Sequence, residues 1–305
     1  MDSLKSQRGL VTKKFNEFFY VDIQEKLKFS EQKRFLCKSK KSIRFQNDFI
    51  FVGDEVFISQ IDFCEKTALI THLIQRKNFL QRPSVANISD IYVTYSVEEP
   101  KLNFAQVSKL LINAEFLNVK VSLILTKCDL INEKQKSLLV QKFRNWGYYP
   151  KILNIDKDSD FISLLEELKT RKCSILMGPS GVGKTTLLNR IIPNLNNPTS
   201  AISSKIKRGK NTTRNIELFS LSKDSYIVDT PGFNLHKIEI ETSSIQLLFP
   251  EISNQLKQNN LRCKFNDCLH IHEPGCVIDK NFDRYKYYKE LVIDPKNQNY
   301  RNLED

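Results

Sequence analysis

The chain has 305 residues and a mass of 35.6 kDa, with 40% hydrophobic and 27% charged residues, so we expect two or three packed domains and exclude global disorder. No run approaches the roughly 18 consecutive apolar residues of a membrane span, and the N-terminal sequence does not resemble a signal peptide. The net charge of +12 favours polyanionic partners, and seven cysteines are too few for a disulfide scaffold. We expect a monomeric, cytoplasmic protein with no membrane association.

Residues 1–78 are expected to form a first domain of short strands. The segments 9–15, 18–23, 34–39, 54–62 and 68–74 carry β-branched and aromatic residues between polar turns. Five short strands of basic character predict an RNA-binding β-barrel of the OB type, and an SH3-like barrel fits almost as well.

Residues 79–242 alternate apolar strands with helices. We expect strands at 91–97, 119–126, 173–177 and 226–230, and helices at 104–116, 135–147 and from Lys184 onward. This alternation predicts a parallel sheet covered on both faces, as in α/β nucleotide-binding domains. Residues 243–305 are expected to form a mostly helical third domain. Within it, the aromatic and basic residues of 283–290 fit either RNA stacking or an ordinary amphipathic helix.

The strongest motif is GPSGVGKT at residues 178–185, which matches G-x-x-x-x-G-K-[ST] between an expected strand and helix. In such a P-loop the backbone N–H groups and the helix N-terminus bind phosphate. Lys184 would bridge the β- and γ-phosphates, and the Thr185 hydroxyl would bind Mg²⁺. The predicted nucleotide-binding residues here are Gly178, Pro179, Ser180, Gly181, Val182, Gly183, Lys184, Thr185 and Thr186.

The TKCD sequence at residues 126–129 resembles the guanine-recognition element N-K-x-D, with Thr126 in the usual Asn place. The Asp129 carboxylate would accept from guanine N1–H and its exocyclic NH₂, a donor pair that adenine lacks, and Lys127 would lie against the base. In ordinary GTPases this element follows the P-loop, whereas here it precedes it. Strand positions rather than chain order build such a site, so the order predicts a circularly permuted domain.

Two segments after the P-loop would complete the site. In DTPG, at residues 229–232, Asp229 would hold Mg²⁺ through water and Gly232 would offer its N–H to the γ-phosphate. The basic segment 205–214 fits a switch loop in which Thr212 or Thr213 completes the Mg²⁺ shell, although a solvated basic loop is the alternative. We assign Lys184, Thr212 and Thr213 as the catalytic residues.

A cysteine and histidine cluster lies near the C-terminus. Cys263, Cys268, His270 and Cys276 supply three thiolates and one imidazole, which suit a closed, tetrahedral and therefore structural Zn²⁺ site. His272 is a competing ligand.

These segments together resemble the circularly permuted, small-ribosomal-subunit-dependent GTPases of the RsgA (YjeQ) family. The resemblance covers nearly the whole chain and rests on VGDEV, RPSVAN, TKCD, GPSGVGKT, GKNTTR, DTPGF and CKFNDCLHIHEPGC. It implies binding of GTP and GDP, GTP hydrolysis stimulated by the 30S subunit in late maturation of that subunit, and contact of the barrel and zinc domain with 16S rRNA. It also implies that His270, and not His272, is the fourth zinc ligand.

Two positions depart from the family pattern, because Asn211 stands where family members often carry His and the guanine loop around Asn154 does not begin with Ser. Phe233 follows DTPG where Ras-like enzymes carry Gln, and the absence of this Gln is usual in the family. Because an apolar residue cannot orient water, we expect slow intrinsic turnover. The alternative is a nucleotide-binding, rRNA-binding assembly factor with little or no hydrolysis, and TKCD disfavours an ATPase.

Overall fold

The computed structural model describes residues 6–23, 34–40, 49–192, 216–229, 240–258 and 260–293. The chain divides into two compact units that each combine segments distant in sequence. The first unit contains Met1–Asp90, Ile162–Leu176 and Thr185–Phe233, and the second contains Ile91–Phe161, Met177–Lys184 and Asn234–Asp305. The predicted domain boundaries near residues 78 and 242 stay predictions.

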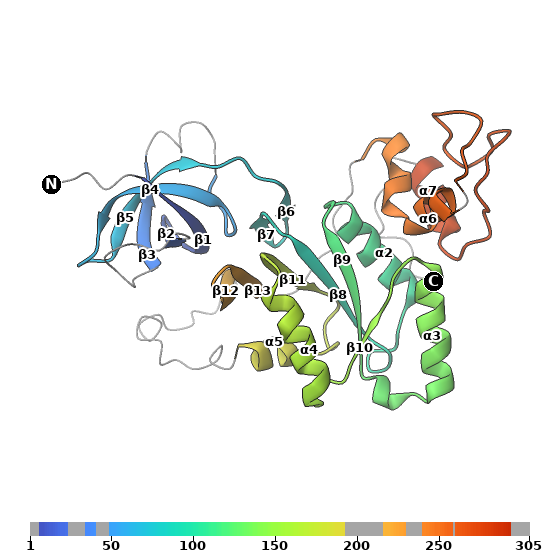
Figure 1. Ribbon diagram of the computed structural model, residues 1–305, viewed down its shortest axis with the longest axis horizontal. Coiled ribbons are helices and arrows are strands. Elements are labelled where there is room, and N and C mark those ends of the chain that lie inside the picture. Colours follow the sequence, from blue (N-terminus) through green and yellow to red (C-terminus); the bar gives the residue numbers. More distant parts are fainter. Residues whose placement is uncertain are drawn as a thin grey trace. The chain divides into compact units, whose positions relative to one another are not determined.

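The N-terminal part of the first unit is a closed β-barrel (Figure 1). Its strands are β1 (Gln7–Phe15), β2 (Phe18–Ile23), β3 (Arg34–Ser39), β4 (Glu55–Asp62) and β5 (Thr67–Leu73). The order is β1-β2-β3-β5-β4, and β4 pairs back to β1. Only β3 and β5 run parallel within the barrel. This Greek-key order confirms the predicted OB-like barrel, whose core residues include Val11, Val21, Phe35, Val56, Ile58 and Ile70.

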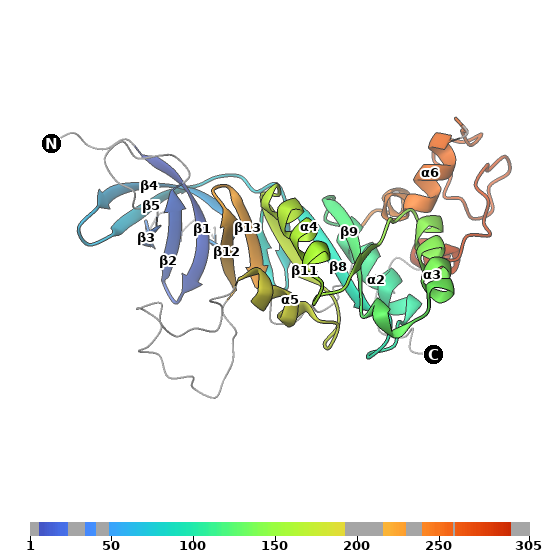
Figure 2. The same ribbon diagram turned by 60° about the horizontal axis from the view of Figure 1, so that its bottom comes forward.

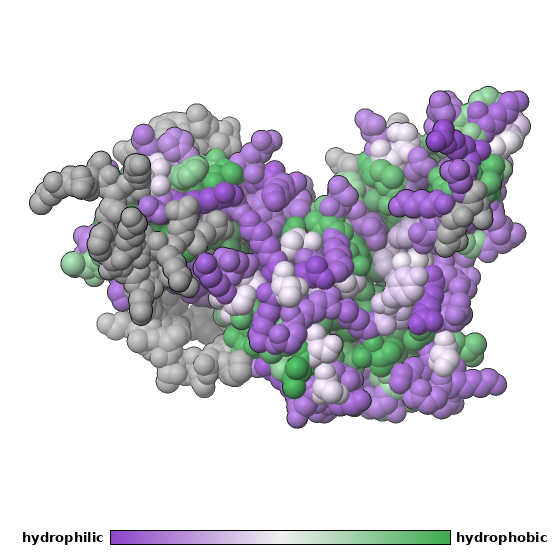
Figure 3. Space-filling model, in the orientation of Figure 1, coloured by the Kyte–Doolittle hydropathy of each residue, from purple (hydrophilic) through white to green (hydrophobic). Residues whose placement is uncertain are grey.

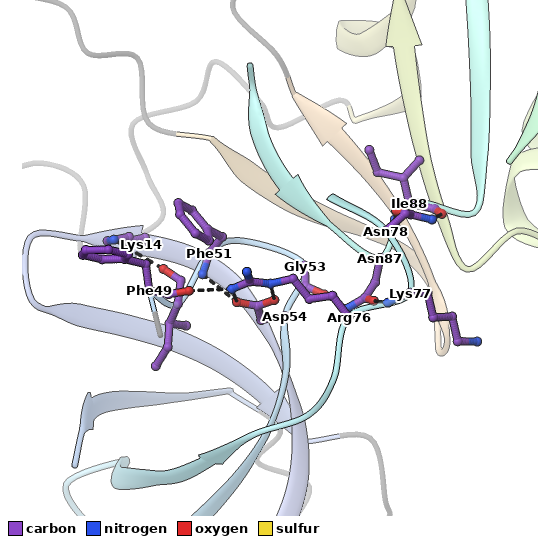
Figure 4. Close-up of polar contacts among 11 residues, drawn as sticks. Lys14, Phe49, Phe51, Gly53, Asp54, Arg76, Lys77, Asn78, Asn87 and Ile88 are labelled. Carbon is purple, nitrogen blue, oxygen red and sulfur yellow. Dashed lines mark hydrogen bonds and ion pairs between the residues drawn. The ribbon is translucent and has the colours of Figure 1, made fainter. Parts of the chain in front are cut away.

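A clamp of charged and amide side chains joins the barrel to the segment that follows it (Figure 4). The buried Asp54 carboxylate accepts from Arg76 Nε at 2.6 Å and Nη2 at 2.8 Å, and from the Phe51 amide at 2.7 Å. The Arg76 guanidinium also lies 5.0 Å from the centre of the Phe51 ring. A buried carboxylate with three donors is well compensated, so this clamp fixes the end of the barrel sequence.

The second half of the clamp involves a close backbone approach. Gly53 has φ of +88°, and a Cβ there would lie 2.1 Å from the carbonyl oxygen of Ala86, so a larger residue does not fit. The Asn87 amide donates to the Gly53 carbonyl at 2.9 Å, and its oxygen accepts from the Lys77 N–H at 2.8 Å. The short hairpin of β6 (Phe79–Gln81) and β7 (Ser84–Ala86) connects these two sides.

The first unit also holds strands of the α/β region. β11 (Cys173–Met177) runs parallel to β13 (Ser225–Asp229), and β12 (Glu217–Ser222) runs antiparallel to β13. β12 lies beside barrel strand β1, with Lys13 opposite Glu217 and a 2.5 Å ion pair between their side chains (Figure 2). The helices α4 (Asp158–Lys169) and α5 (Lys184–Ile191) flank β11 in the sequence.

The second unit contains three strands and most of the helices. Strand order is β10-β9-β8, for β8 (Asp90–Ser96), β9 (Lys120–Thr126) and β10 (Lys151–Leu153), and β10 runs parallel to β9. All seven residues of β8 are buried, as expected for a strand covered on both faces. The remaining elements are α2 (Phe104–Glu115), η1 (Cys128–Leu130), α3 (Glu133–Asn145), η3 (Thr242–Leu248), α6 (Pro250–Gln258) and α7 (Tyr285–Ile293).

Side-chain caps and solvent exposure explain where the helices begin and which face they bury. Asn103 caps α2, and Asn132 and Gln135 form a capping box at the start of α3. Hydrophilic side chains predominate on the exposed face of α3 (Figure 3), which also carries the exposed Leu138, and among the residues of α3 only Phe143 is buried. Among the described residues, no helix has the length and apolar character needed to cross a membrane.

The Asp54 clamp leads to a stability prediction. We expect Arg76→Met to lower the protection of barrel amides against hydrogen exchange by about 2–3 kcal/mol, because the buried Asp54 charge would lose its cation. Arg8→Met is the matched control, since Glu55 would keep its ion pair with Lys172, and its cost should stay below about 1 kcal/mol. Equal protection in both variants would contradict a stabilising clamp.

Candidate nucleotide site and metal centre

The predicted P-loop packs against the backbone of β8. A Cβ on Gly178 would lie 2.0 Å from the carbonyl oxygen of Thr94, so only glycine allows this approach. Gly181 and Gly183 have φ of +84° and +95°. The backbone of the loop therefore follows a path that larger side chains would block, directly before helix α5 begins at Lys184.

A hydrogen bond joins the P-loop to the predicted guanine-recognition element. The Thr126 side chain is fully buried, and its hydroxyl donates to the Val182 carbonyl at 2.8 Å. The Lys184 ammonium donates to the Pro179 carbonyl, and partial burial lowers the pKa of Lys184. The structure thus brings together two motifs that are 56 residues apart in the sequence.

The rest of TKCD forms a tight turn at the end of β9. Lys127 has φ of +55°, and its ammonium donates to the Glu99 carbonyl. Cys128 is buried, and burial raises the pKa of its thiol to about 11, so it is an inert packed cysteine. Asp129 is exposed in η1. The Asp129 carboxylate is therefore exposed to solvent, while the hydrogen bonds of Thr126 and Lys127 hold the turn.

A neighbour of the unassigned guanine loop also contacts the P-loop. A Cβ on Gly183 would lie 2.8 Å from Ile155 Cδ1, so the segment after β10 lies against the loop. The Asn154 side chain accepts from the Asp156 N–H at 3.1 Å, which closes this turn locally. The loop around Asn154 does not begin with the family's serine, and its role could not be predicted from the sequence. The contact between Ile155 and Gly183 forms only in the folded protein.

The other predicted nucleotide residues are placed only in part. Ser180, Thr185 and Thr186 are exposed, the latter two in the first turn of α5 in the first unit. Asp229 ends β13, but its side chain lies outside the described part of the chain. Thr212, Thr213 and Gly232 also lie outside the described residues, as do Asn211 and Phe233.

The four predicted metal ligands come together in the second unit. Their ligand atoms all lie within 4.8 Å of one another, and Cys268 and His270 are buried. His270 Nδ1 is 3.6 Å from Cys263 Sγ and 3.5 Å from both Cys268 Sγ and Cys276 Sγ. A tetrahedral zinc site with Zn–S of about 2.3 Å and Zn–N of about 2.0 Å has N-to-S edges of roughly 3.5 Å. The cluster therefore fits a tetrahedral metal ion, and the exposed His272 does not belong to it.

The loop that carries these ligands is held by a carboxylate inside it. Glu273 accepts from the backbone N–H groups of Leu269, Ile271 and His272 at 2.8 to 3.1 Å. Burial alone would raise the pKa of Glu273, but these hydrogen bonds outweigh it and lower the pKa to about 2. The role of Glu273 could not be predicted from the sequence, because an acid in a polar loop has no distinctive spacing.

Helix α7 supports the same loop from outside. The Tyr285 hydroxyl donates to the His270 carbonyl at 2.9 Å, and the Tyr288 hydroxyl donates to the Leu269 carbonyl at 2.7 Å. Tyr287, Tyr288, Leu291 and Val292 are buried. Residues Tyr285–Ile293 therefore form an amphipathic helix whose buried aromatic residues pack on the protein. This packing favours the interpretation as an ordinary amphipathic helix, and contact with RNA stays a prediction.

The fold and these sites define a P-loop GTPase with an N-terminal barrel and a C-terminal Cys₃His cluster. The sequence matches the RsgA GTPase family over residues 73–239. The small ribosomal subunit biogenesis GTPase RsgA of Prochlorococcus marinus (strain NATL1A) is 41% identical over 290 residues, which cover 93% of this chain and 92% of the relative. The chain belongs to the RsgA GTPase family.

A second relative carries the same name, and two solved structures have a similar fold. The small ribosomal subunit biogenesis GTPase RsgA of Parasynechococcus marenigrum (strain WH8102) is 36% identical, with 85% of this chain and 86% of the relative covered. The crystal structure of YjeQ from Thermotoga maritima has a TM-score of 0.74 at 27% identity, covering 94% of this chain and 99% of its own. YloQ, described as a circularly permuted GTPase, has the same fold with a TM-score of 0.75, 24% identity and 97% coverage of both chains.

The Thr126 hydrogen bond yields a testable prediction. Thr126→Val should raise the dissociation constant for a fluorescent GTP analogue about tenfold, because the Val182 carbonyl would lose its hydrogen-bond donor. The P-loop would then no longer be joined to TKCD by this hydrogen bond. Thr126→Ser, which keeps the hydroxyl, should bind almost normally. Thr12→Val removes a buried hydroxyl from the barrel and controls for general destabilisation. Wild-type affinity in the Thr126→Val protein would show that the link is unimportant for binding.

Proposed function

We propose that this protein is a GTPase that binds the small (30S) ribosomal subunit and hydrolyses GTP to GDP and phosphate as a switch in late maturation of that subunit. The observation that carries the proposal is the hydrogen bond between Thr126 and the P-loop carbonyl of Val182, which supports a site that combines the predicted guanine-recognition sequence with the predicted phosphate-binding loop. The identity of 41% to a small ribosomal subunit biogenesis GTPase, over 93% of the chain, supports the ribosomal role.

Each residue of the site has a proposed role. Backbone N–H groups of 178–183 bind the phosphates, and Lys184 bridges the β- and γ-phosphates. Thr185 holds Mg²⁺, which neutralises charge on the phosphate oxygens when it is bound with GTP. Asp129 selects guanine through its exposed carboxylate.

The switch residues are proposed from sequence alone. Thr212 or Thr213 would join Asp229 and Gly232 in responding to the γ-phosphate. In the sequence the threonine pair and then DTPG follow the P-loop, and this order supports the assignment. Hydrolysis removes the γ-phosphate that orders these switch residues. We therefore expect the protein to leave the 30S subunit after hydrolysis.

We also propose that Cys263, Cys268, His270 and Cys276 hold one structural Zn²⁺ ion. Three thiolates and an imidazole are ligands that zinc prefers, and four protein ligands leave no position for a reactive water. The nearly equal distances from His270 Nδ1 to the three sulfurs, 3.5 to 3.6 Å, support tetrahedral coordination. Zinc would tie together a segment, residues 261–284, that forms no helix or strand.

The basic charge and the two flanking parts support contact with 16S rRNA. A net charge of +12 favours a polyanion, and phosphate contacts dominate the affinity of proteins for nucleic acids. We propose an OB-fold RNA-binding domain at 1–78, a permuted GTPase domain at 79–242 and a zinc-binding domain at 243–305, in a cytoplasmic monomer.

A second candidate is an assembly factor that binds GTP and rRNA but barely hydrolyses GTP. Asn211 favours it, because many family members carry a histidine at this position and an asparagine lacks the basic imidazole. Turnover measurements with ribosomal subunits distinguish the two candidates.

We expect slow GTP turnover by the purified, zinc-replete protein and a rate increase of about tenfold or more when 30S subunits are added, because the subunit orders or supplies the groups that orient water. The 50S subunit and ATP serve as controls and should give no increase. Lys184→Ala should abolish turnover. Nucleotide-dependent binding to 30S without stimulation would favour the second candidate, and no binding would contradict the ribosomal role.

Guanine selection can be tested separately. Asp129→Asn should reduce the preference for GTP over ATP and raise the relative affinity for XTP, because the amide cannot accept from both guanine donors and can donate to the xanthine carbonyl. Competition of the three nucleotides against a fluorescent GTP analogue measures this. An unchanged preference for GTP would mean that Asp129 does not read the base.

A further inference from the structure

A glutamine from another element contacts the proposed metal ligand His270. Gln246 lies on η3, 24 residues before the histidine, and its Oε1 is 2.9 Å from His270 Nε2. The other end of the same amide, Nε2, lies 3.2 Å from the Ser243 carbonyl oxygen. Because a carbonyl only accepts, the NH₂ end must face Ser243, and the amide oxygen must therefore face the imidazole.

This orientation fixes which nitrogen of the histidine carries hydrogen. An amide oxygen cannot donate, so His270 Nε2 must be the N–H group that donates to it. Neutral imidazole then has its free lone pair on Nδ1. Nδ1 is the atom that lies 3.5 to 3.6 Å from the three cysteine sulfurs. The hydrogen bond and the cluster geometry thus require the same tautomer.

We propose that Gln246 is a positioning residue for the metal centre, which selects the metal-binding tautomer of His270 and fixes the direction of its ring. The inference rests on the proposed metal site at the four ligands. Histidine ligands bind a metal more tightly when the second ring nitrogen donates to a fixed acceptor, and loss of that acceptor costs about 10–100-fold in affinity.

The backbone around Gln246 makes it a fixed acceptor. Ile245 and Leu248 on the same element are buried in a core that includes Ile112 of α2 and Leu291 of α7. The main chain of His270 is held independently, because its carbonyl accepts from the Tyr285 hydroxyl. With the backbone fixed on both sides, the Gln246 amide determines how the ring is oriented.

This contact also connects the metal centre to the nucleotide-binding part of the second unit. Gln246 joins the loop of the cluster to η3, and η3 packs on α2 through Ile245, Leu248 and Ile112. The cluster is therefore attached to the rest of its unit by a polar contact in addition to the apolar packing of α7. Metal binding and the position of η3 should influence each other.

The test compares Gln246→Leu, Gln246→Glu and wild-type full-length proteins. Zinc affinity is measured by competition with a chromophoric chelator, and the ring nitrogens of His270 are assigned by long-range ¹H–¹⁵N NMR of the zinc-loaded protein. Gln246→Leu should raise the zinc dissociation constant about 10–100-fold. Gln246→Glu keeps an acceptor and should restore binding to within a few-fold of wild type.

Gln255 provides a matched control in the same part of the chain. Its side chain forms hydrogen bonds with the backbone of Asp279, at 2.8 and 3.2 Å, instead of with one of the four proposed ligands, so Gln255→Leu should leave zinc affinity unchanged. The inference is overturned if the Gln246→Leu protein binds zinc as tightly as the wild-type protein. It is also overturned if the NMR spectrum of the wild-type protein shows the metal bound to His270 Nε2. The spectrum of the wild-type protein decides the question even where Gln246→Leu does not fold. Failure of the wild-type protein to bind zinc would instead overturn the proposed metal site.

Discussion

A full positive charge buried in the second unit organises the contacts around it. Arg284 is completely buried and forms a two-point ion pair with Glu251, at 2.6 Å from Nε and 2.5 Å from Nη2. Its guanidinium also lies 5.1 to 5.5 Å from the ring centres of Trp146, Tyr148 and Phe249. A guanidinium away from water is tolerated only with such partners. Because the partners come from the ends of α3 and η3 and from α6, the charge is satisfied only when these elements meet.

The position of the metal loop follows from this buried ion pair. Arg284 directly precedes α7, and the hydroxyls of Tyr285 and Tyr288 hold the carbonyls of His270 and Leu269. The Trp146 indole donates to Asp283 at 3.1 Å, which adds a second contact between the end of α3 and the start of α7. The cysteine and histidine cluster is therefore held by a helix that is anchored, through the two residues before it, to the end of α3 and to α6. The P-loop and the cluster belong to one folded unit although they are far apart in the sequence.

Motifs with fixed spacing could be predicted from the sequence, and contacts between distant segments could not. The P-loop, TKCD and the four metal ligands are set by local sequence, and the five barrel strands have strong β-branched and aromatic patterns. The sequence patterns did not predict β10, which has three residues, β12, in which only Leu218 is buried, or helix α4. Arg284 and Gln246 lie in polar segments where such residues are usually exposed, so their roles became visible only through their tertiary partners.

The nucleotide site shows how one departure from a motif can keep the geometry that the motif serves. An asparagine at position 126 would offer an NH₂ group with two donors, whereas the Thr126 hydroxyl offers one. In this fold one is sufficient, because that hydroxyl lies 2.8 Å from the Val182 carbonyl while Lys127 holds the turn through the Glu99 carbonyl. The two contacts hold the first two residues of the turn and leave Asp129 exposed. Threonine therefore preserves the attachment of the turn to the P-loop, and in the proposed site the exposed carboxylate of Asp129 is the group that would select the base.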